Sequence, residues 1–175
     1  MGAVSDDGSL VLAASGAAVY RVPQSGAAQV VLSAGSIRSL TVLRNGMDVA
    51  VSDSTTGSVH LVRNAASHPE AAVLVSGIDG VETLYPSSDG QLLFASQSKT
   101  GIASIDLTSA EVKSYPTSIA PTGLIPLRNR DTFLISARTN QPGWIFYRDG
   151  AGGRVVFIPA AGEGARQIPT KGGVR

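Results

Sequence analysis

The stretch Leu84-Tyr85-Pro86-Ser87-Ser88-Asp89-Gly90, followed by Leu92-Leu93-Phe94-Ala95, decides the fold of this chain. Two short apolar runs flank an Asp-Gly pair, and tight hairpin turns favour Asn, Asp and Gly because these residues tolerate positive φ. Gly101 then opens another apolar run, Ile102-Ala103-Ser104-Ile105. The pattern predicts two strands joined by a tight turn, then a third strand that begins at a glycine.

The same layout occurs four times along the 175 residues. The hairpin turns contain Asp7-Gly8, Asn45-Gly46, Asp89-Gly90 and Asn129-Arg130-Asp131. The glycines that open the third strands are Gly16, Gly57, Gly101 and Gly143, spaced by 41, 44 and 42 residues. A fourth apolar run closes each unit, at 29–32, 72–75, 111–115 and 154–158. Four strands in about 42 residues, repeated in register, are typical of β-propeller blades.

We therefore predict an all-β chain with four blades of four antiparallel strands each, in a single domain over residues 1–160. The blades are expected at 3–34, 36–77, 80–118 and 121–160, followed by a C-terminal tail at 161–175. Within the tail, only Arg166-Gln167-Ile168-Pro169 carries a strand signal. A β-sandwich with accidental spacing of its strands is the alternative fold.

Two runs carry a resemblance to a known family. They are Ser5-Asp6-Asp7-Gly8-Ser9-Leu10-Val11-Leu12-Ala13-Ala14-Ser15 and Ser87-Ser88-Asp89-Gly90-Gln91-Leu92-Leu93-Phe94-Ala95-Ser96. Both resemble repeats of bacterial NHL/YVTN-type propellers, in which a Ser/Pro-Asp-Gly turn precedes an apolar strand and then a glycine-initiated strand. The resemblance covers residues 3–160 and implies a ring of roughly six to eight blades. It implies an architecture and no particular activity.

The number of blades raises the question of how the ring closes. Four such blades fill roughly half to two-thirds of a ring, which leaves an apolar face bare on the first and on the fourth blade. Three explanations are open: a fragment of a longer propeller, a half-propeller that pairs with a second copy into eight blades, or a compact four-bladed propeller. We favour a half that associates with itself or whose missing half was lost. The short first strand, within Met1–Val4, belongs to the same question.

The charge is unevenly distributed along the chain. Residues 128–175 hold eight basic and three acidic residues, a net of +5, whereas residues 1–127 hold six basic and ten acidic residues, a net of −4. Opposite charges on the two parts suit head-to-tail contact between copies, although chance variation explains them equally well. The overall charge of +1 gives no reason to expect nucleic acid as a partner.

No targeting or membrane segment is expected. Met1–Leu10 contains Asp6 and Asp7 and no basic residue, unlike the start of a signal peptide. The apolar runs are far shorter than the roughly 20 residues that span a bilayer, so we expect a soluble chain without membrane insertion. The compartment is unknown, and a piece of an exported bacterial protein is one alternative.

The sequence predicts no catalytic, cofactor-binding or metal-ligating residue. Without cysteine there is neither a thiol nucleophile nor a Cys-based zinc site. His60 alternates with apolar strand residues and His68 precedes a proline in a polar loop, a spacing that fits no standard metal site. The residues weighed as a central metal site are Asn45, Asp48, Asp53, Asp79 and Asp106. Turn and strand-edge positions explain these five residues better than a metal site does. The stretch Gly150–Arg154 is explained as a glycine-rich hairpin loop rather than a phosphate loop.

Aromatic residues gather in the fourth repeat, which contains five of the nine. They are Phe133, Trp144, Phe146, Tyr147 and Phe157. Phe133 and Phe157 are expected in the core. Trp144, Phe146 and Tyr147 lie on one strand and must face both of its sides, one buried between blades and the other packed on a partner blade or open as a contact surface.

The function predicted from these features is a non-enzymatic propeller scaffold or binding module for a protein or a small ligand. The alternative is a part of a propeller enzyme of the hydrolase, lactonase or lyase type. No cofactor is expected. The expected partners are a second copy of the chain, or the missing blades of a longer one.

Overall fold

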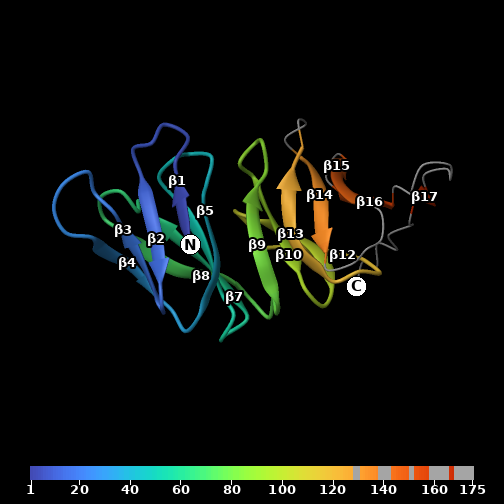
Figure 1. Cartoon of the computed structure of the whole chain (residues 1–175), viewed down its shortest axis with the longest axis horizontal. Coiled ribbons are helices and arrows are strands. Elements are labelled where there is room, and N and C mark those ends of the chain that lie inside the picture. Colours follow the sequence, from blue (N-terminus) through green and yellow to red (C-terminus); the bar gives the residue numbers. More distant parts are fainter. Residues whose placement is uncertain (128–130, 138–142, 150–151, 158–165, 168–175) are drawn as a thin grey trace.

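The architecture is taken from a computed structural model, which describes residues 1–127, 131–137, 143–149, 152–157 and 166–167. Within these residues every regular element is a β-strand, and all pairing is antiparallel. The strands form four sheets that follow one another in space in the order of the chain (Figure 1). The chain is thus an all-β protein built of propeller blades.

Each sheet consists of strands that are consecutive in the sequence, and we call each sheet a blade. Blade 1 consists of β1 (Gly2–Val4), β2 (Val11–Ser15), β3 (Ala18–Arg21) and β4 (Gln29–Ser33). Blade 2 consists of β5 (Ile37–Val42), β6 (Val49–Asp53), β7 (Ser58–Arg63) and β8 (Glu70–Ser76). Blade 3 consists of β9 (Val81–Pro86), β10 (Leu92–Gln97), β11 (Gly101–Asp106) and β12 (Val112–Pro116). Blade 4 consists of β13 (Pro121–Pro126), β14 (Thr132–Ala137), β15 (Trp144–Asp149) and β16 (Gly152–Phe157).

A fifth strand extends blade 4. This strand, β17 (Arg166–Gln167), pairs with β16 through Val156 and Phe157. The strand signal at this point of the tail therefore belongs to the sheet of blade 4. The remainder of the tail, 161–165 and 168–175, lies outside the described residues.

In blades 1 and 3, the turn between the first two strands is held by a Ser–Asp pair. In blade 1, Ser5 Oγ donates to Asp7 Oδ1 at 2.6 Å and accepts the N–H of Leu10 at 2.9 Å. In blade 3, Ser87 and Asp89 repeat the first bond at 2.6 Å. Gly90 then takes a φ of 70°, which a residue with a side chain adopts only at a cost. These contacts explain why the Ser-x-Asp-Gly pattern recurs in the sequence.

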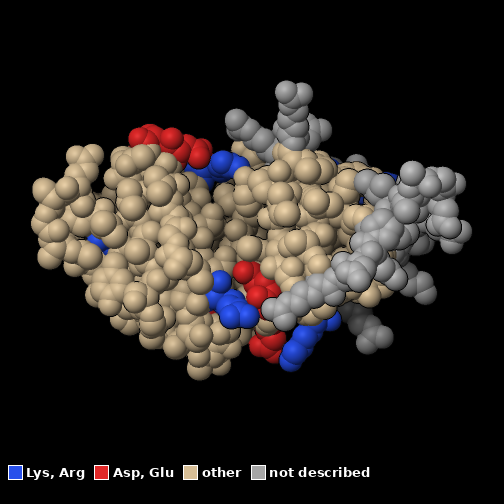
Figure 2. Space-filling model, in the orientation of Figure 1, with Lys and Arg blue, Asp and Glu red and all other residues tan. Residues whose placement is uncertain are grey.

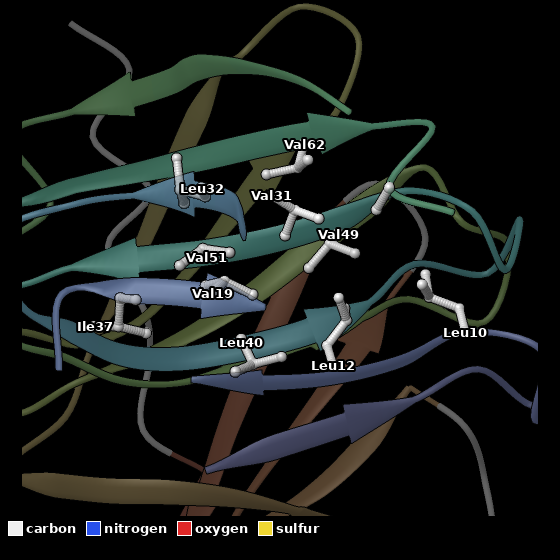
Figure 3. Packing of buried hydrophobic residues seen from close by; sticks show 11 residues of the cluster. Leu10, Leu12, Val19, Val31, Leu32, Ile37, Leu40, Val49, Val51 and Val62 are labelled. Atoms are coloured by element: carbon white, nitrogen blue, oxygen red, sulfur yellow. The ribbon is translucent and has the colours of Figure 1, made fainter. Parts of the chain in front are cut away.

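The core consists of three apolar clusters, one between each pair of neighbouring blades. The first joins blades 1 and 2, where Leu12 and Val19 face Val49 and Val51 (Figure 3). Successive side chains of a strand point to opposite faces, so each inner blade contributes alternate residues to two clusters. Thus Val49 belongs to the first cluster and Ala50 to the second.

The third cluster, between blades 3 and 4, is aromatic. The ring of Phe146 lies 5.3 Å from those of Phe94 and Tyr115 and 6.2 Å from that of Phe133, measured between centroids. Trp144 lies in the same cluster, whereas Tyr147 is on the other side of β15, as strand alternation requires. The side chain of Phe157 lies outside the described residues.

The first strands of neighbouring blades are linked by side-chain hydroxyls. Ser39 Oγ of β5 accepts the N–H of Leu84 in β9 at 3.0 Å, and Thr83 Oγ1 of β9 accepts the N–H of Leu124 in β13 at 3.1 Å. Ser39 and Thr83 occupy equivalent positions in their blades. One type of bond therefore fixes the register of blade 2 on blade 3 and of blade 3 on blade 4.

We expect Thr83→Ala to lower the free energy of unfolding by about 1–2 kcal/mol, because it leaves the buried N–H of Leu124 without its acceptor. Thr83→Ser keeps the hydroxyl and should cost much less. Urea unfolding of the two variants beside the parent measures the difference. Equal losses for the alanine and serine variants would mean that the methyl group, not the hydroxyl, matters.

The four blades leave two sheet faces at the ends of the row. Blade 1 and blade 4 lie at opposite ends of the molecule (Figure 1). The three clusters join blades 1 with 2, 2 with 3 and 3 with 4, and none of them joins blade 4 with blade 1. The described blades therefore form an open row rather than the compact four-bladed ring that the sequence also allowed. Among these residues there is no helix of the length and hydrophobicity needed to cross a membrane.

Candidate functional site

The first strands of the blades carry a repeated irregularity. β5, β9 and β13 each contain one extra residue relative to the partner strand, and these residues are Arg38, Glu82 and Thr122. Such bulges re-aim side chains and occur preferentially at sheet edges. All three strands are edge strands of their sheets, and β9 lies in front together with β1 and β13 in Figure 1. The bulges thus place one polar residue each on the first, edge strands of three consecutive blades.

Two of these bulge residues form an ion pair. Arg38 Nε lies 3.3 Å from Glu82 Oε2; Arg38 is exposed and Glu82 is half-buried. On the face seen in Figure 2, basic side chains (blue) lie directly beside acidic side chains (red). An exposed pair of this kind adds little stability, so its charges are available to a ligand at low cost. We call Arg38, Glu82 and Thr122 the bulge row.

A second polar region lies at the turns, where Arg44 of blade 2 bridges its neighbours. Its Nη1 lies 3.5 Å from Asp6 Oδ2 of blade 1, and its Nε donates to the carbonyl oxygen of Ser87 in blade 3 at 3.4 Å. The guanidinium also lies over the ring of Tyr85, 5.9 Å from its centroid. Hollows of about 240 and 320 Å³ flank this side chain. Arg44 therefore joins three blades and separates two shallow depressions.

Blades 3 and 4 are joined at their turns by a group of charges. Arg148 Nη1 lies 2.6 Å from Asp89 Oδ2 and 3.4 Å from Asp131 Oδ2, while Asp131 Oδ1 accepts the N–H of Ser88 at 2.7 Å. The hydrogen bond to Asp89, opposed by burial and helped by the charges of both carboxylates, raises the pKa of Arg148. The hydrogen bond from Ser87, opposed by burial and helped by Arg148, holds the pKa of Asp89 at about 2. Both groups stay charged at neutral pH, so the Arg148–Asp89 ion pair joins blades 3 and 4 at that pH.

The two histidines both belong to blade 2. His60 is half-buried in β7 and its Nε2 lies 3.1 Å from Ser58 Oγ. His68 is exposed in the connection before β8. Among the described residues, neither histidine forms an ion pair with an acid, the group that would orient a catalytic histidine.

The residues weighed as a metal site are dispersed, and four of the five bind backbone amides. Asn45 caps the β5–β6 turn, Asp48 accepts the N–H of Asn64, and Asp106 caps the β11–β12 turn. Asp53 binds the connection between blades 1 and 2, and Asp79 is exposed in the connection between blades 2 and 3. In the described part of the chain, no three His, Asp or Glu side chains lie close enough together to hold a metal ion.

Asp53 holds the connection between blades 1 and 2 through its carboxylate. Its carboxylate accepts the N–H groups of Gly35, Ser36 and Thr55, each at 2.9 Å. Burial acts to raise the pKa of Asp53, but these three N–H groups and the Thr56 side chain outweigh burial and hold it at about 2. In blade 3 the equivalent residue is Gln97, whose Nε2 donates to the carbonyl oxygen of Asp79 at 3.3 Å. The same position thus ties blade 2 and blade 3 to the connections that precede them.

The glycine-rich stretch Gly150–Arg154 lies at the β15–β16 hairpin, and residues 150–151 are outside the described part. Gly153 has a packing role, because a Cβ at this position would come within 2.7 Å of Phe146 Cζ and 3.0 Å of Tyr115 Cζ. A phosphate loop lies between a strand and the start of a helix, whereas this stretch lies between the two strands β15 and β16.

The sequence reasoning missed the two bridging arginines and the bulge row. A signal for Arg44 existed, because Asp6 and Arg44 occupy the same turn position in neighbouring repeats and have opposite charges. For Arg148 there was no comparable signal, since its partner Asp89 is 59 residues away in the sequence. The bulges depend on the register of two strands and left no mark in the residue pattern.

The comparisons with known proteins establish the fold. A scan of known protein families and a search of curated protein sequences both find no match. Solved structures do match: Kuenenia stuttgartiensis hydrazine synthase has a TM-score of 0.72 and 20% identity over 95% of this chain and 48% of its own. A nidogen/laminin complex has a TM-score of 0.71 and 11% identity over 95% of this chain and 70% of that one.

A third match is a putative 6-phosphogluconolactonase from Bacteroides uniformis, with a TM-score of 0.66 and 18% identity. It covers 97% of this chain and 55% of the lactonase chain. This chain therefore spans about half the length of two of these three proteins. At such identities the likeness concerns the β-propeller fold and says nothing about a shared activity.

Proposed function

We propose that this chain is a non-enzymatic propeller scaffold or binding module, built of blades of the bacterial NHL/YVTN type, that binds a protein or a small ligand. The observation that carries the proposal is that three of the acids considered as metal ligands accept hydrogen bonds from the backbone. Asp48, Asp53 and Asp106 each accept backbone N–H groups of turns or connections. An active site needs titratable groups that converge on one cavity, and these acids stabilise separate parts of the framework instead.

The bulge row supports a binding role. Arg38, Glu82 and Thr122 stand at equivalent positions of consecutive blades, so a ligand lying across the blades meets a cation, an anion and a hydroxyl in turn. Because Arg38 is exposed, a ligand carboxylate can replace Glu82 as its partner without the cost of opening a buried pair. This surface gives the module a place where side chains can change without disturbing the core.

The second candidate function is a part of a propeller hydrolase or lactonase. The similarity to the putative 6-phosphogluconolactonase favours it, although that similarity rests on fold alone. In this case residues outside the described part, or outside this chain, would supply the missing acids.

Metal content and turnover distinguish the two functions. We expect elemental analysis of the purified protein to show divalent metal well below one ion per chain, and δ-gluconolactone to be hydrolysed no faster than in buffer. A stoichiometric ion together with lactone hydrolysis that EDTA abolishes would overturn the proposal. A thermal-shift screen with phosphorylated sugars and short peptides supplies the positive arm: Arg38→Ala should abolish a ligand's shift, whereas Arg63→Ala at the end of β7 should not.

A further inference from the structure

We propose that two copies of this chain close into one ring of eight blades, with the outer face of blade 1 in each copy packed on the outer face of blade 4 in the other. The outer face of blade 1 is its side away from blade 2, and that of blade 4 is its side away from blade 3. The partner is a second copy of the chain, and this contact is independent of the bulge row.

The outer face of blade 1 is apolar across all four strands. Strand pairing places its residues side by side: Val4 opposite Val11, Ala13 opposite Tyr20, and Tyr20 opposite Val30, while the N–H of Val22 bonds to the carbonyl oxygen of Val11. The residues between them, such as Leu12 and Val19, point the other way into the first cluster. Blade 1 is therefore apolar on both sides but covered on one.

The repeat shows what normally covers such a face. Val11 is equivalent to Val49, Leu93 and Phe133, because each follows the residue whose carbonyl oxygen closes the hairpin turn. Val49, Leu93 and Phe133 are 0% exposed, since each packs on the preceding blade, whereas Val11 is 36% exposed. Val22 repeats the comparison: it is 40% exposed, and its equivalents Val62, Ile105 and Phe146 are 0% exposed. Blade 1 thus has the surface of a blade that packs on a predecessor.

The outer face of blade 4 is more exposed than the equivalent faces of the other blades. Its outer face contains Ile125, Leu134, Ile145 and Val156, which stand opposite one another in the strand register. Leu134 is equivalent to Leu12, Ala50 and Phe94, which are at most 1% exposed, yet Leu134 is only half-buried. Leu127 is 39% exposed where its equivalent Leu43 is 8% exposed. Blade 4 has the surface of a blade that packs on a successor.

A second copy is the occupant that supplies both missing surfaces at once. Its blade 4 presents the kind of face that precedes each inner blade, and its blade 1 presents the kind of face that follows each inner blade. The same pairing made twice around a two-fold axis covers all four outer faces and leaves no free end. Charge does not oppose this partner, because residues 3–34 of blade 1 hold two acidic residues and one basic residue, a net of −1, whereas residues 128–175 carry a net of +5. Eight blades also lie within the range of known propellers.

The mass of the whole chain in solution is the primary test. Light scattering coupled to size-exclusion chromatography should give twice the 17.9 kDa of one copy across a dilution series. Val11→Asp puts a charge in the proposed contact and should give a monomer. Val112→Asp is the matched control, because Val112 is a strand valine of 37% exposure on β12, outside both outer faces, and this variant should stay a dimer. Far-ultraviolet circular dichroism confirms that each variant is folded.

Mixing variants tests which faces meet. Ile125→Asp alters the outer face of blade 4 and should also give a monomer. In a mixture of Val11→Asp and Ile125→Asp chains, one contact joins the two altered faces and the other joins two intact faces, so dimers should re-form. If like faces met instead, the Ile125→Asp or the Val11→Asp chain would remain dimeric alone.

Two results would overturn the proposal. One is a parent chain that stays monomeric at every concentration, which would mean that other blades or another protein cover these faces. The other is an assembly whose mass keeps growing with concentration, because a head-to-tail contact that does not close forms open chains.

Discussion

Replacing Phe146 with alanine is expected to lower the free energy of unfolding by about 4 kcal/mol. The ring is fully buried between blades 3 and 4 and contacts the rings of Phe94, Tyr115 and Phe133. Its removal leaves a cavity that these rings can fill only in part, because Gly153 packs on the other side with no side chain to move. Urea unfolding followed by the fluorescence of Trp144, the only tryptophan, measures the loss in the same cluster.

The control is Phe146→Leu, which keeps most of the volume and should cost about 1–1.5 kcal/mol. A loss below 1 kcal/mol in the alanine variant would contradict the packing described for this cluster. It would mean that blades 3 and 4 are not held together by these rings.

Asp53→Asn is expected to lower the free energy of unfolding by about 3 kcal/mol. The substitution keeps the shape but turns one acceptor oxygen into an N–H₂ group, which then faces the N–H of Gly35 or Ser36. The connection between blades 1 and 2 thereby loses a buried, charge-assisted acceptor. Asp106→Asn is the matched control, because its exposed turn needs one oxygen only, and Asn45 already serves the equivalent purpose in the β5–β6 turn.

The pH dependence of stability gives Asp53 a second readout. The pKa of Asp53 is about 2 in the folded chain and near 3.8 in a free carboxyl group, so the unfolded chain binds the proton more tightly. The resulting stability is fully present above pH 4 and is lost as the pH falls from about 4 to 2. Part of the acid sensitivity should therefore disappear in Asp53→Asn. An unchanged slope of stability against pH in this range would contradict the role of the Asp53 carboxylate in holding this connection.

The sequence predicted the parts of the fold that local contacts decide. The turn at Ser87–Gly90 closes through bonds between residues at most five apart, so the Ser-x-Asp-Gly pattern was sufficient to place it. The alternation of Trp144, Phe146 and Tyr147 likewise followed from strand geometry. These local rules, repeated four times, led to the blades and to the propeller.

The candidate site was less accessible to such reasoning. Arg38, Glu82 and Thr122 belong together only because three strands bulge at the same place, and a bulge depends on the register with a partner strand. Asp53 was considered as a metal ligand or an edge residue, but its partners include N–H groups 17 and 18 residues away. Backbone groups are identical in every residue, so no residue pattern could have indicated them.

The unequal composition of the three clusters has a consequence for how the molecule comes apart. Each blade touches only its neighbours, so its resistance to opening is set by one or two adjoining clusters. The cluster with aromatic rings lies between blades 3 and 4, whereas aliphatic side chains join blade 1 to blade 2. In an isolated copy, the amide protons of blade 1 should therefore exchange with solvent deuterium before those of β10, β11 and β14. The fold behaves as a short stack with a loose end at blade 1, one of the two ends that the proposed ring would cover.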